Sequence, residues 1–154
     1  IKLRKATAED AQPLLAVLIE SFPEVGWDMA RLEKSLLKAP DVEAIYVAIE
    51  DNKVVATASV RYLPDRWPDE GVIHWVGALD RVRGKGVGRA LCLRVMQHFA
   101  EDGYEAAMLE TNEFRKDALK TYYRLGFKPH VEDESHHEIW ERIDTWMRES
   151  GIIV

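Results

Sequence analysis

A glycine-rich segment in the middle of the chain has the residue types and spacing of an anion-binding turn. It reads Arg83-Gly84-Lys85-Gly86-Val87-Gly88-Arg89, between an apolar run over 72–79 and a helical pattern that continues to about residue 102. Glycines at alternate positions leave main-chain N–H groups unshielded, and a helix that starts here adds unpaired N–H donors and the positive end of its dipole. The side chains of Arg83, Lys85 and Arg89 add positive charge. The segment therefore predicts a phosphate site.

Two common phosphate-binding motifs do not fit this segment. The chain contains no GxxxxGK[ST], which excludes a Walker loop. In a dinucleotide-binding fingerprint the third glycine would fall on Arg89, and such a turn normally follows the first strand, whereas we expect four strands before it here. The pattern that remains is Arg-x-x-Gly-x-Gly over residues 83–88.

A second motif follows at the distance expected for a known family. The segment Ala118-Leu119-Lys120-Thr121-Tyr122-Tyr123-Arg124-Leu125-Gly126-Phe127 and the glycine turn together resemble the GNAT family of N-acetyltransferases. That family has an acyl-CoA-binding pattern of Gln/Arg-x-x-Gly-x-Gly/Ala and a later A…Y…GF element, and the specific part of the resemblance runs from His74 to Pro129. The chain departs from the family at Asp80, where many members have Pro, and at Arg115, where many have Asn; here Asn112 lies three residues earlier.

The resemblance implies a fold and a cofactor. We expect an α/β fold with a mixed, mostly antiparallel sheet, helices on both faces, and strands four and five splayed apart to admit acetyl-CoA. Main-chain groups from about residue 84 to 89 would hold the pyrophosphate, and the strand that ends at Ala78 would pair with the pantetheine. The full set of expected cofactor-binding residues is Ala78, Leu79, Arg83, Gly84, Lys85, Gly86, Val87, Gly88, Arg89, Asn112 and Tyr122.

The resemblance also implies catalytic roles. Tyr122 would be the general acid that protonates the departing thiolate, with Tyr123 as the neighbouring alternative. His74, in the strand before the turn, would be the base that takes a proton from the amine, directly or through water, because an ordinary imidazole pKa near 6.5 suits that task. Glu70, at the entrance of the same strand, is the rival base.

The function that follows is transfer of an acetyl group from acetyl-CoA to a primary amine by direct attack in a ternary complex. The alternative is a non-catalytic, CoA-binding regulatory or interaction module on the same scaffold. The acceptor would be a small-molecule or peptide amine, bordered by the aromatic residues Trp27, Tyr62 and Trp67. A group of acidic residues favours a cationic acceptor: Glu20, Glu24, Asp28, Asp65, Asp69 and Glu70.

Composition limits the other function classes. A chain of 154 residues, 47% hydrophobic and 31% charged, predicts one globular domain over residues 1–154. A net charge of −6 argues against nucleic-acid binding. The single cysteine, Cys92, falls on an apolar helix face and excludes an intrachain disulfide, which fits a cytoplasmic protein. No signal peptide or membrane-spanning run is visible in the sequence. The sequence is compatible with a homodimer. The absence of an initial Met indicates trimming or preceding residues.

We expect no metal site. The adjacent pair His136-His137 is the one arrangement that suggests metal binding, but adjacent residues on a helix point in different directions.

The periodicity predicts the elements that position these residues. Strands are expected over 1–5, 43–49, 54–62, 72–79, 105–111 and 127–131, and a late strand could come only from 151–154. Helices are expected over about 8–22, 29–38, 87–102, 116–125 and 135–149.

Overall fold

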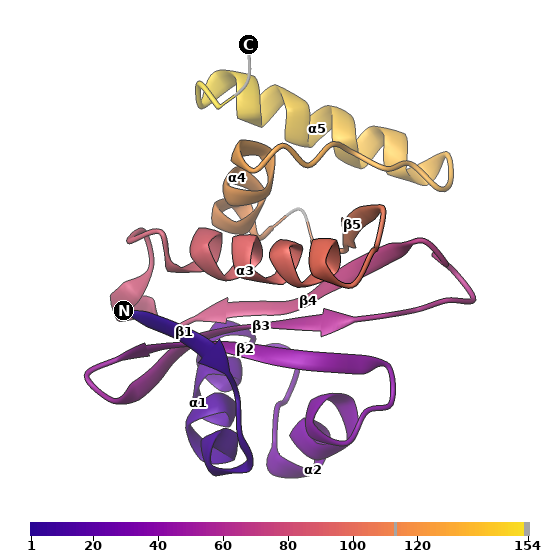
Figure 1. Ribbon diagram of the computed structural model, residues 1–154. Coiled ribbons are helices and arrows are strands. Elements are labelled where there is room, and N and C mark those ends of the chain that lie inside the picture. The colour runs from indigo at the N-terminus through magenta and orange to yellow at the C-terminus, as the bar shows by residue number, and fades with distance from the viewer. Residues whose placement is uncertain (113, 153–154) are drawn as a thin grey trace. The chain divides into compact units, whose positions relative to one another are not determined.

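The computed structural model describes residues 1–112 and 114–152, and the chain divides into two compact units, residues 1–110 and 111–154. The first unit contains one five-stranded sheet in the order β1-β2-β3-β4-β5 (Figure 1). Strands β1 to β4 are antiparallel neighbours, and β5 is parallel to β4. The strands are β1 (Lys2–Lys5), β2 (Val42–Glu50), β3 (Lys53–Arg61), β4 (Glu70–Ala78) and β5 (Ala106–Leu109).

Helices cover both faces of this sheet. Helices α1 and α2 lie on one face and α3 lies on the other (Figure 1). The expected mixed, mostly antiparallel α/β fold is thus confirmed. The helical elements of this unit are η1 (Ala8–Asp10), α1 (Ala11–Ser21), α2 (Met29–Leu32), the π-helical turn η2 (Glu33–Leu37), η3 (Asp80–Val82) and α3 (Val87–Glu101).

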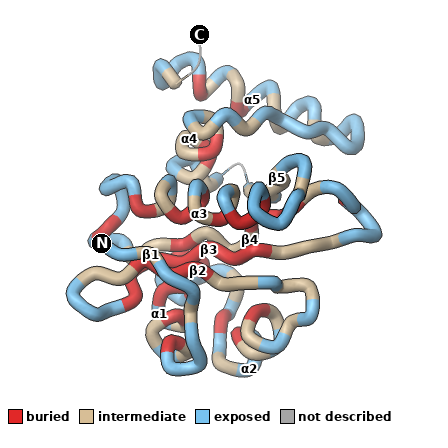
Figure 2. Tube along the Cα trace, in the orientation of Figure 1, coloured by how far each residue is buried: buried red, intermediate tan, exposed pale blue. Residues whose placement is uncertain are grey.

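The core of the first unit consists of two layers of buried side chains, one on each face of the central strands. Buried residues gather in β2, β3 and β4 and on the helix faces turned toward them (Figure 2). Burying each large aliphatic side chain contributes on the order of 2 kcal/mol. The layer under α1 and α2 contains Leu14, Val17, Leu18, Leu32, Leu36, Val47 and Val54, and α3 contributes Leu91, Cys92, Val95 and Phe99.

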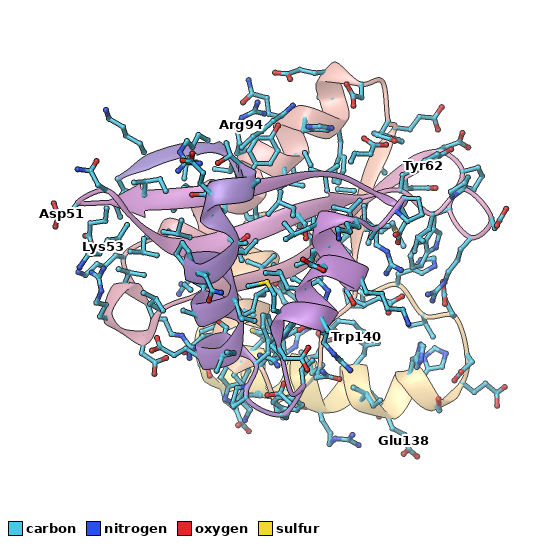
Figure 3. The ribbon with its side chains drawn as sticks, turned by 90° about the horizontal axis from the view of Figure 1, so that it is seen from below. Asp51, Lys53, Tyr62, Arg94, Glu138 and Trp140 are labelled. Atoms are coloured by element: carbon cyan, nitrogen blue, oxygen red, sulfur yellow. The ribbon has the colours of Figure 1, made fainter. Side chains whose placement is uncertain are left out.

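The hairpin between β2 and β3 shows how local sequence sets the register. Its loop is Asp51-Asn52, and both residues have positive φ angles, 50° and 61°. This conformation matches the two-residue turns whose twist suits antiparallel strands, and Asp and Asn tolerate it better than other residues do. Figure 3 shows Asp51 and Lys53 at one end of the hairpin and Tyr62 at the other.

The second unit consists of α4 (Lys116–Arg124) and α5 (Ser135–Glu149), with the bounds of α5 as predicted. Buried side chains of Leu119, Ile143 and Met147 form its core. That the two units form a single domain stays a prediction. No helix in the described part of the chain is both long and apolar enough to cross a membrane.

The predicted strand over 127–131 is wrong. Phe127 donates its N–H to Tyr122 O at 3.0 Å, which closes the end of α4, and residues 128–131 are exposed without a strand partner among the described residues. Pro129 removes one donor, and an exposed run buries no apolar surface to offset the cost of ordering it. In the late segment 151–154, Gly151 and Ile152 form a turn, and residues 153–154 lie outside the described residues.

Candidate functional site

The turn that joins β4 to α3 has the backbone conformation that its glycines allow. Gly84 and Gly86 have positive φ angles of 76° and 81°, a left-handed region that other residues adopt at a cost. The first hydrogen bond of the α3 ladder runs from Ala90 N–H to Gly86 O, at 3.0 Å. The N–H groups of residues 87–89 therefore precede the ladder and can bind a ligand.

The outer side of this turn is open. A Cβ added to Gly84, Gly86 or Gly88 would meet no atom of the described residues within 4 Å. Residues 83–86 are all exposed. Because these glycines make no close packing contact, the main chain of the turn is open on this side. A pyrophosphate fits such a set of exposed donors at a helix N-terminus.

Basic side chains line the same turn. Arg83, Lys85 and Arg89 are exposed, and their charge adds to the positive end of the α3 dipole. Arg83 forms an ion pair with Asp80, with Nε 3.2 Å from Oδ1. Residues 83–86 thus lie in the turn and residues 87–89 in the first turn of α3, and their contact with a phosphate stays a prediction.

Strand β4 leaves part of one edge unpaired. Its pairing with β5 ends at Ile73 and Leu109, so the rest of β4 has no partner on that side in the part of the chain that the structure describes. Leu79 donates its N–H to Val55 O on β3, at 2.9 Å. Since bonding directions alternate along an antiparallel strand, the N–H of Ala78 points away from β3, toward the open edge. Of the expected cofactor-binding residues Ala78 and Leu79, Ala78 is therefore the one whose N–H is directed toward the open edge.

A β-bulge lies where this edge opens. Thr57 pairs with Gly77 and Ser59 pairs with His74, so two residues of β4 oppose one residue of β3. Trp75, inside the bulge, has a φ of 51°, which is rare for a bulky residue. Strained residues and bulges gather at functional sites because they redirect side chains. Nothing in the sequence pattern indicated a role for Trp75.

His74 is the first β4 residue beyond the β5 pairing. Burial lowers the pKa of its imidazole to about 4; the positive charge of Arg61 also lowers it, and Asp41 opposes the shift. The ring is therefore neutral near pH 7 and can accept a proton. Its low pKa makes it a weaker base than an unperturbed histidine.

The rival base, Glu70, lies at the other end of this stretch of strand. It is the first residue of β4, partly buried, and it pairs with Ala106 on β5. His74 lies four positions further along the extended strand, which places its Cα about 13 Å from that of Glu70. The two side chains therefore do not serve the same nitrogen atom, and the open edge favours His74.

Three buried ring nitrogens beside the bulge have no hydrogen-bond partner among the described residues. They are His74 Nδ1, Trp75 Nε1 and Trp27 Nε1. The ring centroids of His74 and Trp75 are 5.0 Å apart, and those of Trp27 and Trp75 are 4.8 Å apart. A buried polar group without a partner is costly unless water or a ligand satisfies it. The cluster therefore places three unsatisfied polar atoms beside the bulge.

The two tyrosines of the second unit differ in their surroundings. Tyr122 is 8% exposed and packs edge-on against Phe127, with centroids 6.2 Å apart. Tyr123 donates its hydroxyl to Asp144 Oδ1 at 3.1 Å, and burial, followed by this bond, raises the pKa of its phenol to about 12. Tyr123 therefore has a structural partner within its own unit. The acid role of Tyr122 stays a prediction from the motif.

Asn112, the remaining expected cofactor residue, is exposed just before α4. Its carbonyl oxygen accepts the N–H of Arg115 at 3.0 Å. This bond shapes the turn into the helix, and a cofactor contact at Asn112 stays a prediction.

Comparison with known proteins agrees with this geometry. A family model described as the acetyltransferase (GNAT) family matches residues 11–127. A mycothiol acetyltransferase from Frankia casuarinae is 37% identical over 75 residues, which cover 49% of this chain and 21% of that relative. The chain thus spans about a fifth of the length of that relative.

Solved structures share the fold. A transcriptional regulator from Bacillus halodurans superposes with a TM-score of 0.70 and 25% identity, over 86% of this chain and 95% of the other. AAC(6′)-Iy, solved with the bisubstrate analogue CoA-S-monomethyl-acetylneamine, gives a TM-score of 0.71 at 18% identity, over 86% and 93% of the two chains. At that identity the second likeness concerns the fold alone.

Proposed function

Because the chain belongs to the GNAT family of acetyltransferases, we propose that it transfers an acetyl group from acetyl-CoA to a primary amine. The observation that carries this proposal is the open glycine turn at the start of α3, next to the unpaired edge of β4. The match to the acetyltransferase family over residues 11–127 supports acetyl-CoA as the cosubstrate.

Each part of the turn has a role in this proposal. The N–H groups from Gly84 to Arg89 bind the pyrophosphate, and the basic side chains of the loop neutralise its charge. The N–H of Ala78 bonds to the pantetheine as a neighbouring strand would. Both sets of contacts orient the thioester at the bulge, where the strand edge is open.

The chemistry is then a direct attack on the thioester. His74 takes one proton from the acceptor ammonium, directly or through a water molecule at the cluster of unpartnered ring nitrogens. The neutral amine forms a C–N bond to the thioester carbon, and main-chain N–H groups of β4 stabilise the oxyanion. The C–S bond breaks, Tyr122 gives its proton to the departing thiolate, and the extra proton on the attached nitrogen passes through water to the Tyr122 phenolate, which leaves a neutral amide and the CoA thiol. The acceptor remains a small-molecule or peptide amine.

A calorimetric titration tests cofactor binding. We expect CoA to bind with micromolar affinity, on the order of −8 kcal/mol. Pantetheine, which lacks the pyrophosphate, is the matched control and should bind at least about 100-fold more weakly if the turn supplies the main contacts. No heat and no thermal shift at millimolar CoA would contradict the assignment of the turn.

The pH dependence tests the role of His74. Because the pKa of His74 is lowered to about 4, its basic form persists as pH falls from 7, and we expect the acid limb of kcat/KM near pH 4 instead of near neutrality. His74→Gln should lower kcat/KM by roughly 10²-fold and remove that limb.

Folding is linked to the same group. A lowered folded-state pKa contributes stability that is fully present above the ordinary value of 6.5 and is lost as pH falls toward 4. Rates must therefore be normalised to the folded fraction, measured by circular dichroism at each pH. If His74→Gln leaves both rate and profile unchanged, the base is elsewhere, and Glu70→Gln is the variant to measure next.

A second candidate function is a non-catalytic CoA-binding regulatory module. The similarity to the transcriptional regulator from Bacillus halodurans favours this candidate. It predicts CoA binding of similar strength but no acetyl transfer to any amine. The two candidates therefore separate in a transfer assay and not in a binding assay.

A further inference from the structure

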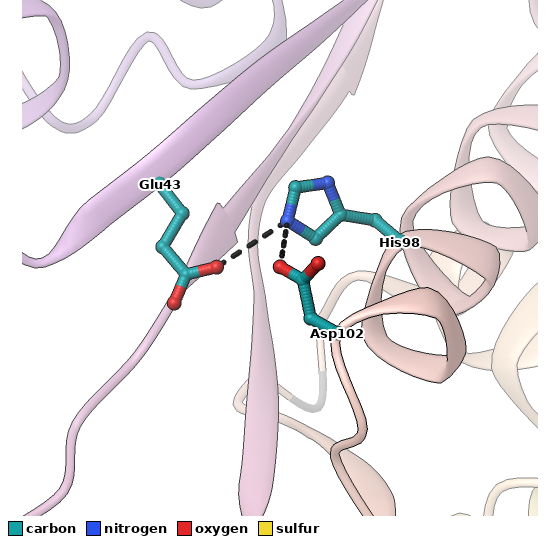
Figure 4. A group of neighbouring side chains, drawn as sticks. All are labelled: Glu43, His98 and Asp102. Carbon is teal, nitrogen blue, oxygen red and sulfur yellow. Dashed lines mark hydrogen bonds and ion pairs between the residues drawn. The ribbon is translucent and has the colours of Figure 1, made fainter.

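Three side chains with metal-ligating atoms meet at the C-terminal end of α3. Glu43 comes from the start of β2, and His98 and Asp102 lie one helical turn apart (Figure 4). His98 Nε2 is 3.3 Å from Glu43 Oε2 and 3.0 Å from Asp102 Oδ2. The three potential ligand atoms all lie within 4.8 Å of one another.

These separations match a metal centre. Zn²⁺ binds imidazole nitrogen and carboxylate oxygen at about 2.0–2.2 Å, so tetrahedral ligands lie about 3.4 Å apart. The two measured distances from His98 are close to that value. Small side-chain rotations would place the three ligand atoms at three corners of a tetrahedron around the ion, and a water molecule would occupy the fourth corner.

Side chains that bind a metal usually form a second hydrogen bond that orients them, and His98 and Glu43 each have such a partner. Tyr46 hydroxyl lies 2.9 Å from His98 Nδ1, which fixes the orientation of the ring and leaves Nε2 directed at the carboxylates. Tyr104 donates its hydroxyl to Glu43 Oε1, on the oxygen that does not face His98. The ring of Tyr46 is itself held under Arg94, with the guanidinium 4.5 Å from the ring centroid. Such second contacts are typical of metal sites.

The charge of the cluster also favours a cation. Among residues 1–112 and 114–152, neither Glu43 nor Asp102 forms an ion pair with Lys or Arg. Asp102 lies at the negative end of the α3 dipole, where a carboxylate is disfavoured. The side chains of Glu43 and Asp102 are 30% and 51% exposed, so a hydrated ion can reach both.

We propose that Glu43, His98 and Asp102 bind one divalent transition-metal cation, with Zn²⁺ preferred because the set combines one imidazole with two carboxylates. The ion would tie the start of β2 to the end of α3 and stabilise the first unit. Helix α3 has 15 residues and is about 22 Å long, and the glycine turn is at its other end. The role is therefore structural and independent of acetyl transfer.

Calorimetry on chelator-treated protein tests this proposal, with ZnCl₂ as the probe. We expect one ion per chain at micromolar affinity, and a Tm that rises with Zn²⁺ concentration. Substitution of Co²⁺ should give the visible absorption of a tetrahedral site. Absence of binding at millimolar Zn²⁺ would overturn the proposal and leave only a hydrogen bond that His98 shares between two carboxylates.

Matched variants locate the ion. Asp102→Asn removes a ligand at an exposed position and should weaken Zn²⁺ binding at least about 100-fold, since loss of an outer-shell partner alone typically costs 10- to 100-fold. Tyr104→Phe, which removes such a partner, should weaken it about 10-fold. Glu101→Gln removes the neighbouring exposed carboxylate and should change nothing. Equal effects of Glu101→Gln and Asp102→Asn would show adventitious surface binding and contradict the site.

Discussion

Replacing Gly86 with Asp is expected to weaken CoA binding by about two to three orders of magnitude. Gly86 has a φ of 81°, and a Cβ added there would meet no atom of the described residues within 4 Å, so the new carboxylate would occupy the space assigned to the pyrophosphate. Two like unit charges about 4 Å apart repel each other by roughly 1 kcal/mol in bulk water and roughly 4 kcal/mol near a protein surface. The pyrophosphate carries more than one negative charge. We expect affinity to fall by about 10²- to 10³-fold in calorimetry with CoA.

Gly86→Asn is the matched control. Asn is nearly isosteric with Asp and also tolerates a left-handed backbone, but it carries no charge. It should weaken CoA binding far less than Asp does, and circular dichroism should show both variants folded. If Asn and Asp weaken binding equally, the effect is one of backbone strain or bulk; if neither weakens it, CoA does not bind at this turn.

Replacing Tyr122 with Phe is expected to lower kcat by roughly 10²- to 10⁴-fold, the usual range for a positioned general acid. The variant keeps the ring that packs against Phe127 and removes only the hydroxyl. Affinity for acetyl-CoA should change little, because the phenol is assigned to the leaving group. The measurement is steady-state kinetics under conditions where chemistry limits the rate. An unchanged kcat would show that another group or water protonates the thiolate.

Tyr123→Phe is the control for this experiment. The hydroxyl of Tyr123 donates to Asp144 on α5, so its loss should destabilise the second unit. A hydrogen bond to a charged partner contributes about 1.5–3 kcal/mol, discounted here because the pair is only partly buried. The rate of the folded enzyme should be nearly unchanged. The contrast between neighbouring phenols separates an effect on chemistry from one on stability.

The sequence predicts most of the fold because local signals and burial agree. The strands expected over 43–49 and 54–62 and the apolar helix face that carries Cys92 each correspond to an element of the structure, namely β2, β3 and α3. The glycine turn was predictable for the same reason, since its backbone conformation depends on residues that follow one another in the chain. The prediction of a strand over 127–131 is wrong because a five-residue pattern does not show whether a neighbouring strand is present to pair with it.

The less predictable parts of the site depend on contacts between distant residues. The bulge at Trp75 arises from the register of β4 against β3, which no local pattern encodes. The low pKa of His74 follows from burial in that sheet and from Arg61 on the next strand. Glu43 and His98 lie 55 positions apart in the chain, so their sequence spacing did not indicate that they are close in space. The adjacent pair His136-His137 suggested metal binding from sequence alone, although adjacent helical residues point in different directions.

Initial-velocity kinetics distinguishes acetyl transfer by direct attack in a ternary complex from the alternatives. Acetyl-CoA is titrated at several fixed concentrations of a primary amine selected from a broad panel, with the amide product identified by mass spectrometry. Direct attack in a ternary complex predicts an N-acetylated product and intersecting double-reciprocal lines. Parallel lines with an acetylated enzyme would contradict direct attack, and CoA binding without transfer to any amine in the panel would contradict the enzymatic function itself.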